Sequence, residues 1–198
     1  MNNVSLTYFV NFVLKAGTPR ITVVKEFKGR DVYDPQTDFY KMLRERVIET
    51  FRSGQPIGSL ESWASSVHEK KRAAYLAVIT GLKRFVGRRA HEWFEPPREN
   101  FTLGGIPLNV NPELGLMIEG VPHIIKLYLK DDPPLVKNRT QLILRILETA
   151  LSATSPGCTF AVLDARKGRL HASGSSPSSI DALLAGEAAA FKVMYDTV

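Results

Sequence analysis

Residues 110–130, VNPELGLMIEGVPHIIKLYLK, bring together side chains that could act on a phosphate ester. Glu113 precedes one apolar run, and Lys126, Tyr128 and Lys130 alternate with apolar residues along the next. A carboxylate can hold a divalent cation that activates water, and a lysine can stabilise charge that develops on a phosphate. The stretch therefore has the outline of a metal-dependent site for phosphodiester cleavage.

The two apolar runs are expected to be neighbouring strands of a hairpin. Side chains alternate between the two faces of a strand, so Lys126, Tyr128 and Lys130 share one face of the second run. A two-residue turn at Glu119-Gly120 places Glu113 opposite Lys126. A four-residue turn places Glu113 opposite Tyr128 instead, with the two lysines diagonal to it. Both registers keep the leucines on the other face, so the charged cluster is expected under either turn.

Because of this pattern of acid and lysine, the region 35–170 resembles the PD-(D/E)XK, or restriction-endonuclease-like, superfamily. The resemblance implies an αβββαβ core, with an acid on one central strand and an acid-x-lysine on its neighbour, where the carboxylates hold a divalent metal. Pro112-Glu113 matches the first half of the motif, and Lys130, or else Lys126, matches its final lysine. Gln141 matches the start of the Gln-x-x-x-Tyr signature of exonuclease-type members, with an arginine where tyrosine is expected. The catalytic residues that the resemblance implies are Glu113, Lys126, Tyr128, Lys130 and Gln141.

The second acid of the motif is absent. Tyr128 stands two residues before Lys130, and a tyrosine supplies no carboxylate. Ile124 stands two residues before Lys126 and supplies none either. Magnesium is held by oxygen ligands, usually one or two carboxylates together with water. We therefore expect a degenerate site in which Glu113 alone would bind Mg²⁺ weakly.

Other acids could replace the missing carboxylate. The candidates are Glu45, Glu49, Asp131 and Asp132. The first two lie in an expected helix, where the ordinary role of an acid is a solvated face, and the Asp pair stands where a loop begins. Glu113 itself has an ordinary alternative, a cross-strand ion pair with Lys126 on a half-exposed sheet.

The chain is basic, with a formal net charge of +6 and a sequence pI of about 9.5. This balance permits a polyanionic partner such as nucleic acid without requiring one. Two basic groups lie on one expected helix, and the second also complements the dipole at the end of that helix. The residues expected to contact nucleic-acid phosphates are Lys70, Lys71, Arg72, Lys83, Arg84, Arg88 and Arg89.

The elements that must position these residues begin with a mainly helical part over 1–90. The run LTYFVNFVL lacks a basic leader and contains Asn11, so we expect a buried helix or strand here and no export signal. The β-branched residues of PRITVVKEF favour a strand or an extended segment. Two amphipathic helices are expected next, over 34–51 and 59–85.

Residues 91–171 are expected to form the central sheet, because Gly and Pro punctuate apolar runs rich in strand-forming residues. Three strand segments are expected, then an amphipathic helix, then a hairpin that turns at Lys167-Gly168. A last helix is expected over 178–197. The strand segments are 92–105, 106–119 and 121–130, and the helix that follows them is 140–151.

This order predicts an α/β (α+β) fold over 1–198 as a single domain, with a mixed sheet, a restriction-endonuclease-like αβββαβ core and an N-terminal helical elaboration. The single cysteine, Cys158, fits a reducing, cytoplasmic compartment, and no stretch indicates a membrane anchor. The function expected is to act on or alongside nucleic acid without efficient cleavage. One alternative is an active metal-dependent nuclease with a relocated acid. Another is a non-catalytic interaction module with a protein partner or as a homodimer.

Overall fold

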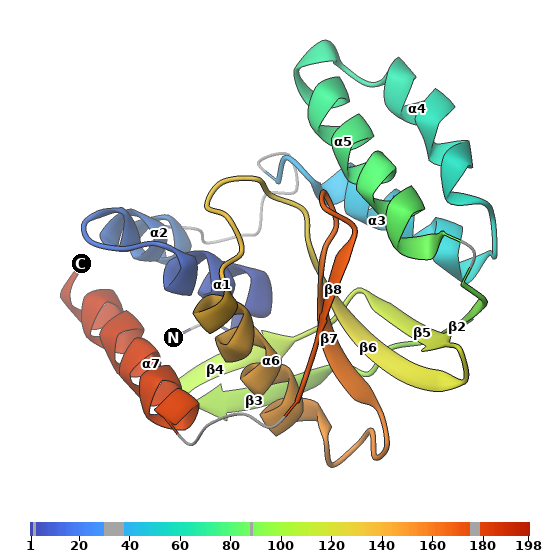
Figure 1. The fold of residues 1–198 in the computed structure, drawn as a ribbon. Coiled ribbons are helices and arrows are strands. Elements are labelled where there is room, and N and C mark those ends of the chain that lie inside the picture. Colours follow the sequence, from blue (N-terminus) through green and yellow to red (C-terminus); the bar gives the residue numbers. More distant parts are fainter. Residues whose placement is uncertain (2, 30–37, 88, 175–178) are drawn as a thin grey trace.

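A computed structural model describes residues 1, 3–29, 38–87, 89–174 and 179–198 (Figure 1). The chain has the expected α/β class, with helices packed around mixed sheets. Within the described ranges, no helix is both long enough and apolar enough to cross a membrane.

The main sheet has the strand order β2-β5-β6-β7-β8. Its strands are β2 (His91–Phe94), β5 (Leu114–Ile118), β6 (Val121–Tyr128), β7 (Thr159–Asp164) and β8 (Arg169–Ala172). Strands β6 and β7 are parallel, whereas the other neighbouring pairs are antiparallel. A parallel pair needs a crossover, and helix α6 (Lys137–Leu151) provides it between β6 and β7.

A second sheet has the order β1-β4-β3, formed by β1 (Val4–Ser5), β3 (Glu99–Leu103) and β4 (Ile106–Val110). The expectation of three strand segments between 92 and 130 is therefore wrong, because five strands cover this region and β3–β4 is an inserted hairpin. Pro96-Pro97 separates β2 from β3, and Asn111-Pro112 separates β4 from β5. Proline lacks a backbone N–H, so these positions end strands and let the chain change sheets.

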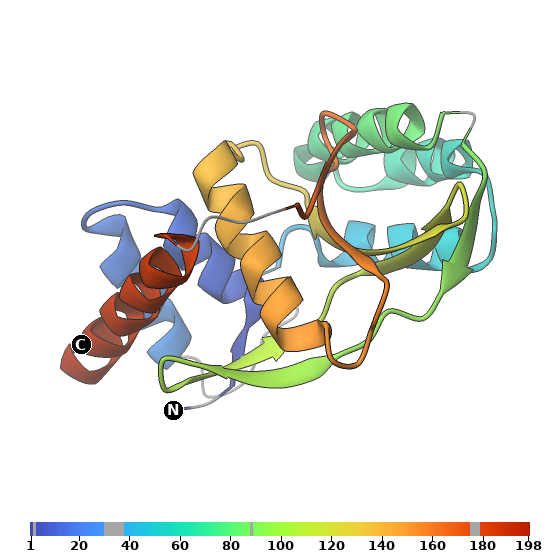
Figure 2. The same ribbon diagram turned by 60° about the horizontal axis from the view of Figure 1, so that its bottom comes forward.

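The helices form two groups (Figures 1 and 2). On one side of the main sheet, α3 (Lys41–Arg52), α4 (Leu60–Ser66) and α5 (Glu69–Val86) enclose what we call the α3–α5 core. On the other side, α1 (Leu6–Leu14), α2 (Pro19–Lys28), α6 and α7 (Ser179–Thr197) enclose the α1–α6 core together with the second sheet. Strand β6 contributes to both, because Ile125 and Leu127 face the first core while Ile124 and Tyr128 face the second.

Two elements of the N-terminal half differ from the sequence prediction in kind or in continuity. The segment PRITVVKEF is helix α2 and not a strand, because Pro19 starts a helix and its Val23 and Val24 are buried in the α1–α6 core. The helix expected over 59–85 is broken into α4 and α5, preceded by the 3-10 turn η2 (Ile57–Ser59). The break lies at His68, whose ring Nδ1 accepts a hydrogen bond from the Lys70 N–H (3.3 Å) and caps α5.

The remaining expected elements lie close to their predicted places. Helix α3 ends within one residue of the expected place, but it begins only at Lys41, because residues 38–40 form a turn and not the predicted helix. The start predicted at Asp34-Pro35 lies outside the described residues. Helices α6 and α7 confirm the helices expected over 140–151 and 178–197, and β7–β8 confirms the hairpin at Lys167-Gly168.

The hairpin of β5 and β6 has the shorter of the two turns considered. Ile118 pairs with Val121, which leaves Glu119 and Gly120 as a two-residue turn. Their φ angles of 50° and 82° lie in the left-handed region that such a tight turn requires. This register places Glu113 directly opposite Lys126.

Candidate functional site

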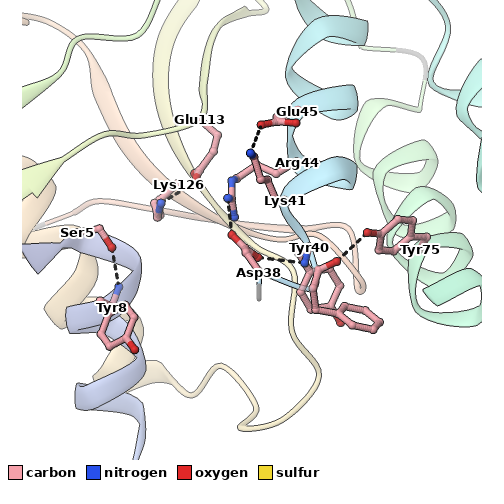
Figure 3. Close-up of polar contacts among 11 residues, drawn as sticks. Ser5, Tyr8, Asp38, Tyr40, Lys41, Arg44, Glu45, Tyr75, Glu113 and Lys126 are labelled. Atoms are coloured by element: carbon pink, nitrogen blue, oxygen red, sulfur yellow. Dashed lines mark hydrogen bonds and ion pairs between the residues drawn. The ribbon is translucent and has the colours of Figure 1, made fainter. Parts of the chain in front are cut away.

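Glu113 and Lys126 form a buried ion pair between the two central strands (Figure 3). Glu113 lies just before β5, and its backbone N–H donates to the Ile125 carbonyl (3.1 Å), which continues the ladder by one residue. The Lys126 Nζ lies 2.5 Å from Glu113 Oε1, and the Leu127 N–H donates to Oε2 at 2.7 Å. Glu113 is 8% exposed and Lys126 is 4% exposed. Both carboxylate oxygens are therefore engaged inside the fold.

Tyr128 and Lys130 have hydrogen-bond partners other than Glu113. The Tyr128 hydroxyl donates to the Pro133 carbonyl, and burial, followed by the charges of Asp164 and Asp132, raises the pKa of Tyr128 to about 12. Tyr128 is thus a neutral hydrogen-bond donor at physiological pH.

Lys130 lies beyond the end of β6 and reaches α1. Its Nζ donates to Asn11 Oδ1 (2.9 Å), and burial, followed by the nearby Lys15 ammonium, lowers the pKa of Lys130. The geometry therefore separates the two candidate lysines of the motif. Lys126 is the partner of Glu113, whereas Lys130 binds Asn11 on α1.

A cleft of about 840 Å³ opens above this hairpin, between α1, α2 and the residues that lead into α3. The Glu113 side chain lines the cleft and also lines a smaller cavity of about 60 Å³ that reaches Lys126 and Tyr128. The acids that line the cleft are Glu26, Asp38, Glu113, Asp131 and Asp132. The bases that line it are Lys15, Arg44 and Lys130. The cleft is therefore of mixed charge and is not a uniformly basic channel.

Asp38 and Arg44 are cleft residues that the sequence analysis missed. Arg44 Nη2 lies 2.6 Å from Asp38 Oδ2, and the Tyr40 N–H donates to Asp38 Oδ1 (3.1 Å), so Asp38 fixes the approach to α3 (Figure 3). The Tyr75 hydroxyl of α5 donates to the Phe39 carbonyl (2.7 Å) and holds the same segment from the other side. An Asp shortly before an amphipathic helix is a capping signal in sequence, and it would have indicated structure without indicating the cleft.

The proposed substitute acids divide into two kinds. Glu45 pairs with Lys41 (3.7 Å) and Glu49 with Arg52 (3.9 Å) on the exposed face of α3, and neither is among the residues that line the cleft. Both of the Asp131-Asp132 residues line it, and Asp131 lies 3.6 Å from Arg166. Among the acids considered from sequence, the Asp pair alone shares the cleft with Glu113.

Gln141 lies half-buried on α6 and is not among the residues that line either cavity. The arginine at the signature's tyrosine position, Arg145, makes a two-pronged contact with Asp181 (2.6 and 3.1 Å) and so ties α6 to α7. The structure therefore does not bring the Gln141 signature to the Glu113 site.

The predicted phosphate contacts lie at the two ends of α5. The helix has 18 residues and is therefore about 27 Å long, so one site cannot gather both basic groups. The C-terminal basic group is engaged locally, with Lys83 on Glu61 (2.9 Å), Arg84 on the Lys167 carbonyl (3.0 Å) and Arg89 on the Phe85 carbonyl (3.1 Å).

The N-terminal basic group, Lys70, Lys71 and Arg72, lies near the cleft. Lys71 Nζ is 5.5 Å from the centre of the Phe39 ring, and Phe39 is one of the cleft residues. Arg88 lies outside the described residues.

No group of three His, Cys, Asp or Glu side chains suited to a metal ion occurs in the described part of the chain. What the arrangement offers chemically is a buried, satisfied ion pair at the floor of a cleft that carries both charges and several aromatic rings. No model of a known protein family matches the sequence, and a search of curated proteins finds no match either.

Proposed function

We propose that the chain is a restriction-endonuclease-like protein with a degenerate metal site, which binds nucleic acid without cleaving it efficiently. The order of elements supports this, because α5, β2, β5, β6, α6 and β7 follow one another as αβββαβ once the β3–β4 hairpin is set aside. Glu113, which directly precedes β5, and Lys126 on β6 support it too, because the resemblance implies an acid and a lysine on neighbouring strands. Because one fold serves many functions, the function must be inferred from the chemistry of the site and not from the fold.

The observation that carries the proposal is the state of the Glu113 carboxylate. One oxygen faces the Lys126 ammonium and the other accepts a backbone hydrogen bond, so a dication would have to displace both partners. The position of the motif's second acid is Ile124, which is buried in the α1–α6 core. This donor set does not fit Mg²⁺, and we expect Mg²⁺ to bind weakly.

A second candidate, an active nuclease with a relocated acid, is favoured by one observation. Asp38 and the Asp131-Asp132 pair line the same cleft as Glu113. Asp38 and Asp131 each have an arginine partner already, which lowers the attraction of the cleft for a cation.

We also propose a reducing, cytoplasmic compartment. Cys158 is a free cysteine, and partial burial raises the pKa of its thiol, which makes it a poor nucleophile.

The cleavage test uses purified protein with linear duplex DNA, single-stranded DNA and RNA, each with Mg²⁺, Mn²⁺ or chelator. We expect little or no metal-dependent cleavage. Robust cleavage that disappears in Glu113→Gln and Asp131→Asn, but persists in the exposed control Glu45→Gln, would establish the second candidate instead. Circular dichroism of each variant would exclude loss of folding as the cause.

The binding test is fluorescence anisotropy with labelled DNA and RNA at low and at physiological salt. Phosphate contacts release counterions, so affinity should fall steeply as salt rises. Failure of every nucleic acid to bind at low salt would refute the proposal and favour a protein-interaction module.

A further inference from the structure

Exposed and half-buried aromatic and basic side chains form a strip that begins at Phe39 on the margin of the cleft and continues over α3, α4 and α5. Phe39 is 38% exposed and Met42 is 50% exposed, although both are large apolar residues. The Lys71 ammonium lies over the Phe39 ring. The Arg46 guanidinium lies 5.8 Å from the centre of the Trp63 ring. We call these residues, Phe39, Met42, Arg46, Trp63 and Lys71, the aromatic–basic strip.

The two cations of this strip make no ion pair with an acid in the described ranges. Within the part of the chain that the structure describes, Arg46 and Lys71 form no ion pair, and neither do the adjacent Lys70 and Arg72. At the other end of α5, in contrast, Lys83 meets Glu61 at 2.9 Å. The end of α5 nearest the cleft therefore carries positive charge that an external anion can use.

The exposed Phe39 ring is held in place from below. Its backbone carbonyl accepts the Tyr75 hydroxyl at 2.7 Å. Its ring packs edge-on against Tyr40 and Tyr75, with centroids 4.8 and 5.9 Å away. A positioned ring loses little conformational entropy when a flat ligand stacks on it.

We propose that this strip binds single-stranded nucleic acid, with a base stacked at Phe39 and phosphates on Lys71 and Arg46. This inference rests on the proposed function and names the form of nucleic acid that the cleft margin recognises. Exposed aromatic faces beside cations are the means by which proteins hold single strands, since every unpaired base offers a flat face. In a duplex these faces are covered by neighbouring base pairs, so Phe39 could not stack on them.

The charge distribution also favours a single strand at the margin over a duplex in the cleft. A duplex needs an extended basic surface, whereas Lys83, Arg84 and Arg89 at the C-terminal end of α5 are engaged with groups of the protein itself. The cleft interior has mixed charge with more acids than bases, which disfavours a run of phosphates along it. We therefore place the strand along the strip and not in the interior of the cleft.

The experiment measures binding of a fluorescein-labelled oligothymidylate and of a duplex of equal length by anisotropy at low salt. We expect the wild-type chain to bind the single strand at least about tenfold more tightly than the duplex. Phe39→Ala and Phe39→Leu should weaken single-strand binding about tenfold, and Phe39→Trp should restore it because a larger ring stacks better. Val193→Ala, an exposed apolar residue on α7, is the matched control and should change nothing.

A second pair of variants tests the charge. Lys71→Gln should weaken single-strand binding and reduce its salt dependence, whereas Lys192→Gln, the same change on the exposed surface of α7, should leave both unchanged. Equal affinity for single strand and duplex, or equal effects of Phe39→Leu and Val193→Ala, would overturn this inference while leaving the proposed function standing. Absence of any nucleic-acid binding would overturn both and point to a protein partner. Thermal unfolding of each variant would separate loss of binding from loss of folding.

Discussion

The buried Glu113 carboxylate accepts two hydrogen bonds, so removal of either donor would leave a buried carboxylate oxygen without a partner. Lys126→Met should lower the free energy of unfolding by about 3–5 kcal/mol, because it leaves a buried carboxylate without its counter-charge. The double variant Glu113→Gln/Lys126→Met should recover much of that loss. Urea denaturation at neutral pH measures both.

The control for this prediction is Lys83→Met, which breaks the half-exposed pair with Glu61. Exposed pairs contribute about 0–1 kcal/mol, so this variant should remain close to wild type. If Lys126→Met were as mild as Lys83→Met, the Glu113 side chain would have to reach water, contrary to its burial.

Tyr128 should give the protein a specific alkaline instability. Its pKa is raised from 10.0 to about 12 in the folded chain, so folding favours the neutral phenol. The stabilisation, about 2–3 kcal/mol for a shift of this size, is fully present below pH 10 and is lost as pH rises through about 12. Tyr128→Phe removes this dependence and, at neutral pH, costs about 1 kcal/mol through the lost hydrogen bond to Pro133.

The measurement is the difference in unfolding free energy between wild type and Tyr128→Phe from neutral pH to about pH 11. The difference should shrink and then change sign as pH rises above 10. A constant difference would contradict the prediction, and Tyr195→Phe at the end of α7 is the matched control.

At this scale, the sequence predicted the pair and missed its surroundings. Strand parity was enough to put Glu113 and Lys126 on one face under either turn, because it depends on a few neighbouring residues. The choice between Lys126 and Tyr128 as the residue opposite Glu113 stayed open until the structure showed the two-residue turn. The burial of the pair was not predicted, since a half-exposed sheet was expected. Asp38 and Arg44 lie near the start of α3 and line the same cleft as residues of α1, which are distant in sequence, and no local pattern encodes this arrangement.

Helix α5 packs closely against the β7–β8 turn at Gly81. A Cβ on Gly81 would lie 1.9 Å from the Ala165 carbonyl oxygen and 2.5 Å from that of Arg166, so the helix could not keep its place. Gly81→Ala should therefore destabilise the chain by several kcal/mol, on the order of other severe overpacking, despite the better helix propensity of alanine.

Gly186→Ala in α7 is the matched control, because a Cβ there meets nothing within 4 Å. It should raise the free energy of unfolding by up to about 1 kcal/mol through helix propensity alone. Thermal denaturation of the two variants compares them directly. If both glycines tolerated alanine equally, α5 would not rest on the turn as closely as described.

The elements that the sequence predicted best are those with strong periodicity, such as α6, α7 and the β7–β8 hairpin. The strand predicted for PRITVVKEF was wrong, because burial of Val23 and Val24 in a helix outweighs the preference of β-branched residues for strands. The β3–β4 hairpin was missed because apolar alternation does not tell which sheet a strand joins. The sequence signal that could have indicated this change of sheet was the proline at 96, 97 and 112, where strands end.

For the whole molecule, the two cores on opposite faces of one sheet should unfold together. Leu147→Ala, in the α1–α6 core, should lower the free energy of unfolding by about 2–5 kcal/mol. Trp63 and Trp93, the two tryptophans of the chain, both pack against the α3–α5 core. Their fluorescence therefore reports a loss that originates on the other face.

We expect the denaturation midpoint followed by tryptophan fluorescence to shift in Leu147→Ala as much as the midpoint followed by circular dichroism. Leu82→Ala, in the α3–α5 core, is the matched variant and should behave the same way. A fluorescence midpoint that stays at the wild-type value in Leu147→Ala would show two independent folding units.

Strand β6 has a consequence for the exchange of backbone amide hydrogens. It is paired with β5 on one edge and β7 on the other, and its residues from Ile124 to Tyr128 are buried on both faces. No local fraying frees these amides, so deuterium enters them only when the entire sheet separates. The slowest-exchanging amides of β6 would therefore read out the global unfolding free energy of the native protein without any denaturant, whereas the edge strand β8 would report only its own opening.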